Sequence, residues 1–300
     1  MARLRIMTEA DIPGGMRLKE LAGWNQTPSD WERFLRASPE GCFVAESEGR
    51  VLGTATTIVY EGRFAWIGMV LVDPESRGRG IGTRLLARAI EHLDALGVPT
   101  LKLDATPQGE PIYAKLGFVS EYEIERWALD RRPGSDGLRE QNPDGLARGP
   151  AAVEHSGRSP AAAPPALEDI FKWDREVFGA DRSALLASLH DQAPFFTLHV
   201  QRQNELAGYA LGRRGSRADH LGPCVARDQS SARALLAEFL QRSKRDTIFV
   251  DCVKPNRCAC ELVRSLGFEF SRPLTRMCRG PNRHPGRPED VCAILGPEFG

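Results

Sequence analysis

The 300-residue sequence lacks a net charge and any long apolar run. Its 40 basic and 40 acidic residues cancel, so the chain has no overall electrostatic attraction to nucleic acid or to an anionic membrane. No apolar run approaches the length of a membrane span, and the first residues show no signal-peptide pattern. We therefore expect a cytoplasmic protein with no nucleic-acid partner and no membrane partner.

The sequence also lacks a regular cysteine pattern. Its seven cysteines are an odd number, which does not indicate a disulfide framework. The cluster of Cys252, Cys258 and Cys260 has no C-x-x-C spacing, and no paired His or Cys follows at the distance used in zinc sites. Reduced, buried thiols fit this pattern better, and we expect no metal.

Hydrophobic residues make up 41% of the sequence, which is enough for one large or two ordinary domains. A change of composition along the chain favours two domains. Residues 131–166 contain six prolines and five glycines and show no hydrophobic period. This segment is predicted to link a domain at residues 1–130 to a second domain at residues 167–300.

A strand, a glycine-rich turn and a helix follow one another between residues 64 and 97. The turn carries Gly78, Gly80 and Gly82, and apolar residues at helical spacing follow it up to Gly97. Glycines let a phosphate approach the backbone, and the free N–H groups at the start of a helix favour an anion. The turn therefore predicts an anion site. It matches neither a Walker loop nor a G-x-G-x-x-G dinucleotide loop.

Two motifs in this region occur together. Arg77, Gly80 and Gly82 form Arg-x-x-Gly-x-Gly, and residues 113–118 end as Tyr-x-x-x-Gly-Phe. The first motif alone could be a turn that binds nothing. In this order, however, the two resemble the pyrophosphate loop and the closing motif of the GNAT superfamily of acetyl-CoA-dependent N-acetyltransferases. The resemblance implies acetyl-CoA as co-substrate, bound by Val70, Leu71, Val72, Arg77, Gly78, Arg79, Gly80, Ile81, Gly82 and Thr83.

The same order of elements is predicted twice along the chain. Strand, helices, three strands, helix, strand, helix and strand are predicted in the first part, and a matching series begins at residue 167. Leu-Gly-Phe at residues 116–118 recurs 150 residues later at 266–268. The chain thus resembles a tandem of two GNAT-like domains. This implies an α/β fold in which each domain has a mixed, mostly antiparallel central sheet flanked by helices. The resemblance also implies that two central strands splay apart to admit pantetheine.

The second copy lacks the features expected to bind the cofactor. Its corresponding loop, residues 226–231, contains no glycine, and Asp228 would repel a diphosphate. Val263 stands at the position equivalent to Tyr113. We expect a degenerate C-terminal domain that supports the first domain and could wall its acceptor pocket.

Five residues are candidates for the chemistry. Tyr113 stands where the superfamily usually places its general acid; a phenol of pKa near ~10 suits a thiolate of pKa near ~8.5, although a packing role is open. Asp104 and Glu110 are candidates for a base or for binding a cationic acceptor. Helix capping by Glu110 and solvent as the base are the alternatives. Trp24 and Asn25, in a loop between predicted helices, are candidates for acceptor binding; packing and capping are the alternatives.

The resemblance therefore implies an N-acetyltransferase in which a primary amine attacks acetyl-CoA directly in a ternary complex. The acceptor is expected to be a small-molecule or peptide amine that the sequence does not identify further. Two other hypotheses stay open: an acyl-CoA sensor without turnover, and a scaffold that binds no cofactor. Both a monomer and a homodimer are compatible with the sequence.

Overall fold

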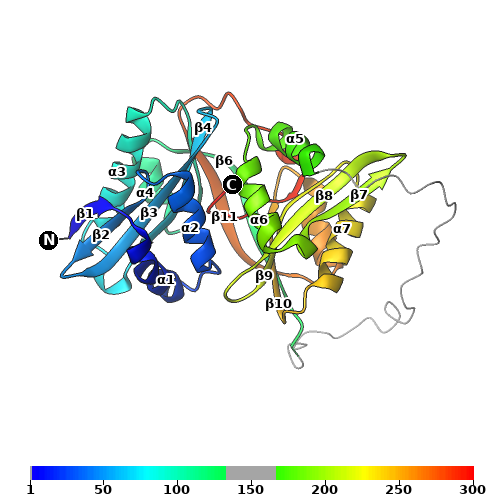
Figure 1. The fold of residues 1–300 in the computed structure, drawn as a ribbon, viewed down its shortest axis with the longest axis horizontal. Helices are drawn as coiled ribbons and strands as arrows, with labels where there is room; N and C mark the ends of the chain where they lie inside the picture. The colour runs from blue at the N-terminus through cyan, green and yellow to red at the C-terminus, as the bar shows by residue number, and fades with distance from the viewer. Residues whose placement is uncertain (1, 133–166) are drawn as a thin grey trace.

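A computed structural model describes residues 2–132 and 167–300. They form two lobes that lie side by side and share one twelve-stranded sheet (Figure 1). The β4–β5 and β9–β10 pairs are parallel, and the other strand pairs within the described ranges are antiparallel. Helices flank the sheet in both lobes, which confirms the predicted fold class. The predicted linker, residues 131–166, lies outside the described residues except for its first two.

The first lobe follows the predicted order of elements. In chain order it contains β1 (Arg3–Ile6), η1 (Glu9–Asp11), α1 (Ile12–Leu21), α2 (Pro28–Ala37), β2 (Phe43–Ser47), β3 (Arg50–Tyr60), β4 (Phe64–Val72), η2 (Pro74–Ser76), α3 (Ile81–Ala95), β5 (Leu101–Ala105), α4 (Glu110–Lys115) and β6 (Val119–Asp130). Local signals set the ends of several helices. Thr27 and Asp30 form a capping box at the start of α2, and Gly97 follows α3 with a φ of +70°.

The second lobe repeats this order from the pair of helices onward and adds a final short strand. It contains α5 (Leu167–Phe178), α6 (Ser183–Gln192), η3 (Pro194–Phe196), β7 (Leu198–Arg202), β8 (Glu205–Arg214), β9 (Asp219–Ala226), α7 (Gln229–Arg242), β10 (Thr247–Val253), α8 (Arg257–Ser265), β11 (Glu269–Arg279), η4 (Pro288–Asp290) and β12 (Val291–Ala293). No helix in the described ranges is both long enough and apolar enough to cross a membrane.

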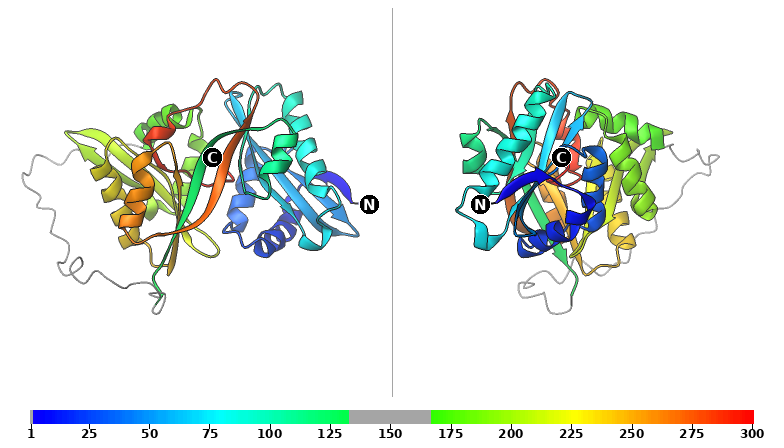
Figure 2. Two further views of the ribbon diagram at one scale, coloured as in Figure 1. Left: turned by 180° about the vertical axis from the view of Figure 1, so that it is seen from behind. Right: turned by 60° about the vertical axis from the view of Figure 1, so that its left-hand side comes forward.

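Strands β6 and β11 connect the two lobes. β11 pairs with β5 of the first lobe, and β6 pairs with β10 of the second. The two strands also pair with each other, so the order β4-β5-β11-β6 in the first lobe corresponds to β9-β10-β6-β11 in the second. Figure 2 shows both strands running between the lobes. Each lobe therefore completes its sheet with a strand from the other half of the chain.

The apolar core also crosses the boundary between the lobes. One buried cluster contains Trp31 and Phe34 of α2 together with Trp173 and Tyr209 of the second lobe. Phe299 belongs to the same cluster and stacks on Phe34, with ring centroids 4.6 Å apart. Each lobe thus buries apolar surface that the other lobe covers.

In the second lobe, a strand of the same chain fills the gap between β9 and β10. These strands pair only at residues 248–250 and then diverge. β12 pairs with β9 beyond that point, and the Ile294 N–H donates to the Asp251 carbonyl oxygen at 3.0 Å. A side chain at Gly222 would lie 1.8 Å from the Ile294 carbonyl oxygen, so this close approach needs glycine.

Candidate active site

In the first lobe, the gap between the parallel strands is open. β4 and β5 pair only at Ala65–Leu101 and Trp66–Lys102. Beyond these pairs β4 continues to Val72 without a partner on that side among the described strands. Its N–H and C=O groups can therefore pair with an extended ligand, much as a sheet edge accepts a peptide. This geometry confirms the splayed strands that the family resemblance implied.

A bulge in β4 lies at the inner end of this opening. Met69 has a φ of +49°, and the register between β3 and β4 shifts beside it. The Thr54 hydroxyl donates to the Met69 carbonyl oxygen at 2.7 Å and holds the bulge in place. A non-glycine residue in the left-handed region is strained, and such strain often marks a functional site. No sequence pattern marks this bulge.

The loop after β4 is exposed but anchored at its base. The buried Asp73 carboxylate accepts from Arg17 at 2.7 Å and from Arg50 at 2.8 Å. Gly78 and Gly80 have φ values of +73° and +72°, and a Cβ on either would meet no atom within 4 Å. The backbone conformation, rather than packing, thus favours glycine at both positions.

The first turn of α3 begins directly after this loop. Its first N–H groups have no intrahelical acceptor, and the helix dipole adds positive potential there. Arg77 and Arg79 are exposed beside this turn. The predicted cofactor loop therefore has the geometry of an anion site, and binding of a CoA diphosphate by residues 77–83 stays a prediction.

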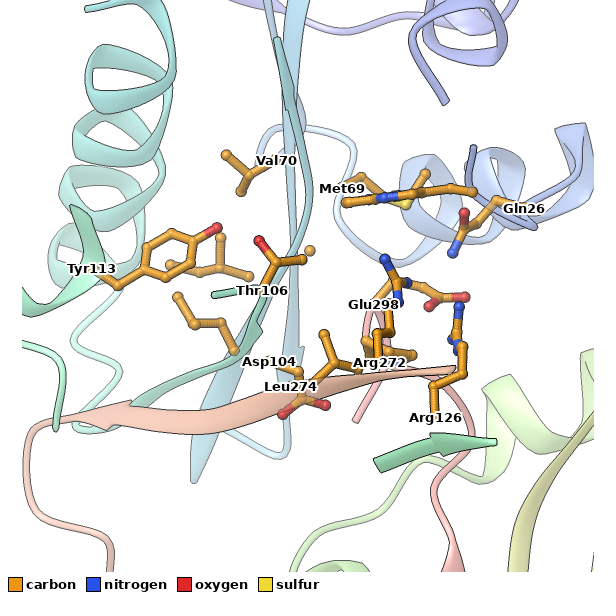
Figure 3. Close-up of a pocket in the computed structure, with 15 residues that line it drawn as sticks. Gln26, Met69, Val70, Asp104, Thr106, Tyr113, Arg126, Arg272, Leu274 and Glu298 are labelled. Atoms are coloured by element: carbon orange, nitrogen blue, oxygen red, sulfur yellow. The ribbon is translucent and has the colours of Figure 1, made fainter. Parts of the chain in front are cut away.

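A pocket lies beside the bulge, with walls from both halves of the chain (Figure 3). The first half contributes Trp24, Gln26, Met69, Val70, Asp104, Thr106, Tyr113 and Arg126, among others. The second half contributes Arg272, Leu274, Pro297 and Glu298. The structure thus brings four of the predicted site residues, Trp24, Val70, Asp104 and Tyr113, to one pocket.

Tyr113 lines the pocket, and its role as a general acid stays a prediction. Figure 3 shows its hydroxyl directed into the pocket toward Val70 and Thr106. Its ring packs edge-on against Phe118, with ring centroids 6.2 Å apart. Burial raises the pKa of Tyr113 to about 12, so the phenol carries its proton throughout the neutral range.

Gly109 offers a test of how precisely this phenol is placed. An added Cβ would lie 2.8 Å from Cε2 of Tyr113, whereas the backbone at φ −82° and ψ −33° accepts alanine. We expect Gly109→Ala to lower kcat about tenfold because the ring must move. Steady-state kinetics should show little further loss when Tyr113 is already phenylalanine. An equal loss in both backgrounds would contradict an effect through Tyr113.

Asp104 is held in a buried ion pair. Both of its carboxylate oxygens accept from the Arg276 guanidinium, at 2.8 and 2.9 Å. Arg276 lies over the Trp66 ring, 4.6 Å from its centroid. Burial raises the pKa of Asp104, while Arg276 opposes that change. Figure 3 shows the Asp104 carboxylate directed away from the centre of the pocket. A role for Asp104 as base or acceptor ligand stays a prediction.

Glu110 and Asn25 lie outside the pocket wall. Glu110 accepts from the hydroxyls of Ser120 and Thr275. The Asn25 side chain accepts from two N–H groups at 2.9 Å and donates to the Ala218 carbonyl oxygen at 3.0 Å. These bonds tie the loop between α1 and α2 to the second lobe. Asn25 therefore positions its neighbours in that loop, and the roles predicted for Asn25 and Glu110 stay untested.

Sequence reasoning missed several residues of the pocket. Gln26, next to the predicted pair, lines the wall in place of Asn25. Arg126, Arg272 and Glu298 reach the pocket from β6, β11 and the segment after β12. No spacing motif connects them, because the strand exchange and the long return of the chain bring them together. Met69 could be recognised as a site residue only from its backbone conformation, a φ of +49°.

Fold and site together define a GNAT-type acetyltransferase, in which an open strand pair leads from a glycine-rich loop to a pocket lined by Tyr113. Comparisons with known families agree. A model of the Acetyltransferase (GNAT) family matches residues 16–118, and a model of the Acetyltransferase (GNAT) domain matches residues 170–293. The chain belongs to the GNAT superfamily and contains two GNAT domains in tandem, as the repeated order of elements predicts.

Several known proteins resemble the chain over most of its length. It is 26% identical over 278 residues to the holothin acyltransferase of Pseudoalteromonas sp. (strain SANK 73390), covering 92% of this chain and 87% of that protein. A putative acetyltransferase from Pyrococcus horikoshii superposes with a TM-score of 0.77 at 24% identity, covering 100% of this chain and 96% of that one. A tandem GNAT protein from the clavulanic acid biosynthesis pathway gives 0.62 at 17% identity, covering 93% and 98%. The two solved structures support the fold.

Proposed function

We propose that the protein transfers an acetyl group from acetyl-CoA to a primary amine in the first lobe. The opening between β4 and β5 carries this proposal, because it joins the anion loop to the pocket that holds Tyr113. The loop at residues 77–83 binds the diphosphate, and the free backbone of β4 pairs with the pantetheine amides. The thioester then lies beside Met69 and Val70.

The pocket supplies the groups that this reaction needs. The neutral amine attacks the thioester carbonyl carbon, and the C–S bond breaks as the tetrahedral intermediate collapses. Tyr113 gives its proton to the leaving sulfur, the amine nitrogen loses a proton to solvent, and solvent returns a proton to Tyr113. Met69 and Val70 have no register partner on β3, so the bulge leaves backbone N–H groups there for the developing oxyanion. The products are an amide and the CoA thiol.

In this proposal, the second lobe binds no acyl-CoA. β12 occupies the gap where a pantetheine chain would lie. At the start of α7, the Asp228 carboxylate accepts from the Ser231 N–H at 2.8 Å and takes the place of an anionic ligand. The second lobe instead completes the acceptor side of the first site through Arg272 and Glu298.

Release of CoA thiol from acetyl-CoA, measured against a panel of amines, tests the proposed function. We expect amine-dependent, saturable release, with intersecting initial-rate lines that indicate a ternary complex. Parallel lines would contradict direct attack, because they indicate a covalent enzyme intermediate. Stabilisation by acetyl-CoA without turnover of any amine would favour the acyl-CoA sensor. Neither stabilisation nor turnover would favour the scaffold.

A further inference from the structure

The side of the pocket opposite Tyr113 contains buried acceptors without donors. Glu298 is 3% exposed and Gln26 is 5% exposed, and both line the pocket. Glu298 Oε2 and Gln26 Oε1 have no hydrogen-bond partner in the described part of the chain. Figure 3 shows both residues on the same side of the pocket. Since unpaired buried acceptors are costly, the two oxygens point to a ligand that brings N–H groups.

A cation without a partner lies beside these acceptors. Arg272 lines the pocket and has neither an ion pair nor a hydrogen bond within residues 2–132 and 167–300. Burial lowers its pKa to about 10, so the guanidinium still carries its charge at neutral pH. The Asp251 and Glu298 carboxylates act on Arg272 only through space. A largely buried guanidinium with no ion-pair partner in the described ranges points to an anionic group on the ligand.

The surrounding charges indicate how much negative charge the ligand brings. The other arginines of this region have carboxylate partners; the pairs are Arg33 with Asp30, Arg126 with Asp251, and Arg213 with Glu298. His220 lies between Arg213 and Asp251 and adds no charge, because burial keeps its pKa below the ordinary value. Arg272 therefore leaves this cluster with one positive charge in excess. A carboxylate matches this excess, whereas a phosphate monoester carries about −1.5 to −2 at neutral pH.

We propose that the acceptor is an amino acid, a primary amine that carries a carboxylate in the same molecule. This inference rests on the proposed function and names its substrate class. Arg272 binds the carboxylate, while Glu298 Oε2 and Gln26 Oε1 accept the N–H groups of the amine. The nitrogen then faces the thioester position beside Met69. In the reactive form the neutral amine and the carboxylate together bring one negative charge, which balances Arg272.

Matched acceptors test this proposal in the full chain. Each of a set of α-, β- and γ-amino acids is compared with its carboxamide and with the amine that lacks the carboxyl group. O-phosphoethanolamine is the phosphate probe. Rates of CoA release are corrected for the fraction of neutral amine in each acceptor. We expect the preferred amino acid to have a kcat/KM at least about tenfold above those of its two neutral counterparts and of the phosphate probe.

Two arginines on β11 provide a matched pair of variants. Arg272→Met keeps the length of the stem, and we expect it to raise KM for the amino acid about 10- to 100-fold and to remove the preference over neutral amines. Arg279, on the same strand, lies outside the pocket and pairs with Asp94 at 2.9 Å. Arg279→Met should keep the preference. Both variants should be stabilised by acetyl-CoA as the wild type is, which reports on folding and on the cofactor site.

The outcomes separate this inference from the proposed function. Preference for neutral amines or for the phosphate probe in the wild type overturns the amino-acid acceptor and leaves the acetyltransferase intact. An unchanged preference in a folded Arg272→Met protein overturns the assignment of the carboxylate site. If no amine of any set releases CoA, the proposed function fails and this inference fails with it. If the wild type prefers an amino acid and Arg272→Met abolishes this preference, the result supports both the proposed function and the amino-acid acceptor.

Discussion

A Tyr113→Phe protein is expected to release CoA about 100-fold more slowly than the wild type at saturating substrates, or more slowly still. A positioned general acid commonly contributes 10²–10⁴-fold, and phenylalanine removes only the hydroxyl. The ring can keep its edge contact with Phe118, so folding and acetyl-CoA binding should persist. Steady-state kcat, together with the thermal shift on adding acetyl-CoA, measures the two effects separately.

Tyr122→Phe is the matched control for the loss of a buried tyrosine hydroxyl. The Tyr122 oxygen accepts from Arg276 at 2.7 Å, and this residue lies outside the pocket wall. The Tyr122→Phe protein should keep kcat within a few-fold of the wild type.

The pH dependence of kcat gives a further test of Tyr113. The acid must be protonated to act, and the pKa of Tyr113 is raised to about 12. The wild-type kcat should therefore show no alkaline decline below about pH 10, about two units under that pKa. A Tyr113→Phe protein with wild-type kcat would contradict the assignment.

The second large effect is expected at the cofactor loop. Gly82 is the second residue of α3, and its Cβ would lie 3.3 Å from Val72 Cγ2. In a Gly82→Trp protein, the indole would occupy the space through which a diphosphate reaches the helix start. A ligand at 100 times its Kd stabilises a protein by about 2.7 kcal/mol, and the variant should lose this stabilisation by acetyl-CoA. Thermal unfolding with and without acetyl-CoA measures it.

The second lobe provides the control for this variant. Ser230 is the exposed second residue of α7 and thus corresponds to Gly82 in the chain repeat. Ser230→Trp should leave the stabilisation by acetyl-CoA unchanged. If Gly82→Trp is stabilised as strongly as the wild type and Ser230→Trp is not, the cofactor site has been assigned to the wrong lobe. If the folded wild type shows no shift, the enzyme hypothesis loses its basis.

Elements that depend on nearby residues could be predicted from the sequence. The strand, glycine-rich turn and helix predicted between residues 64 and 97 are β4, the loop after it and α3 in the structure. An apolar run marks the strand, and apolar residues at helical spacing mark the helix. The exchange of β6 and β11 could not be predicted in this way, because pairing between residues far apart leaves no local pattern. The pairing of β12 with β9 could not be predicted for the same reason.

The two sides of the candidate site also differ in how far apart their residues lie in the sequence. The proposed cofactor side comes from one continuous stretch, residues 70–83, whose strand and glycines can be recognised in the sequence. The proposed acceptor side comes from Gln26, Arg126, Arg272 and Glu298, which lie far apart in the sequence and meet in the pocket. Their charges make sense only after the ion pairs of their neighbours are known. Physical proximity, which the sequence does not state, decides the role of each.

The segment from residue 291 to residue 300 contacts the two GNAT domains in different ways and links them structurally. Its first residues occupy the gap of the second lobe as β12, and Glu298 then enters the pocket of the first. The inactivity proposed for one copy and the completed site proposed for the other thus depend on the same ten residues. The two GNAT domains therefore cannot be separated into one complete domain and one dispensable domain. A change that displaces β12 from the gap in the second lobe is therefore expected to displace Glu298 from the pocket of the first lobe as well.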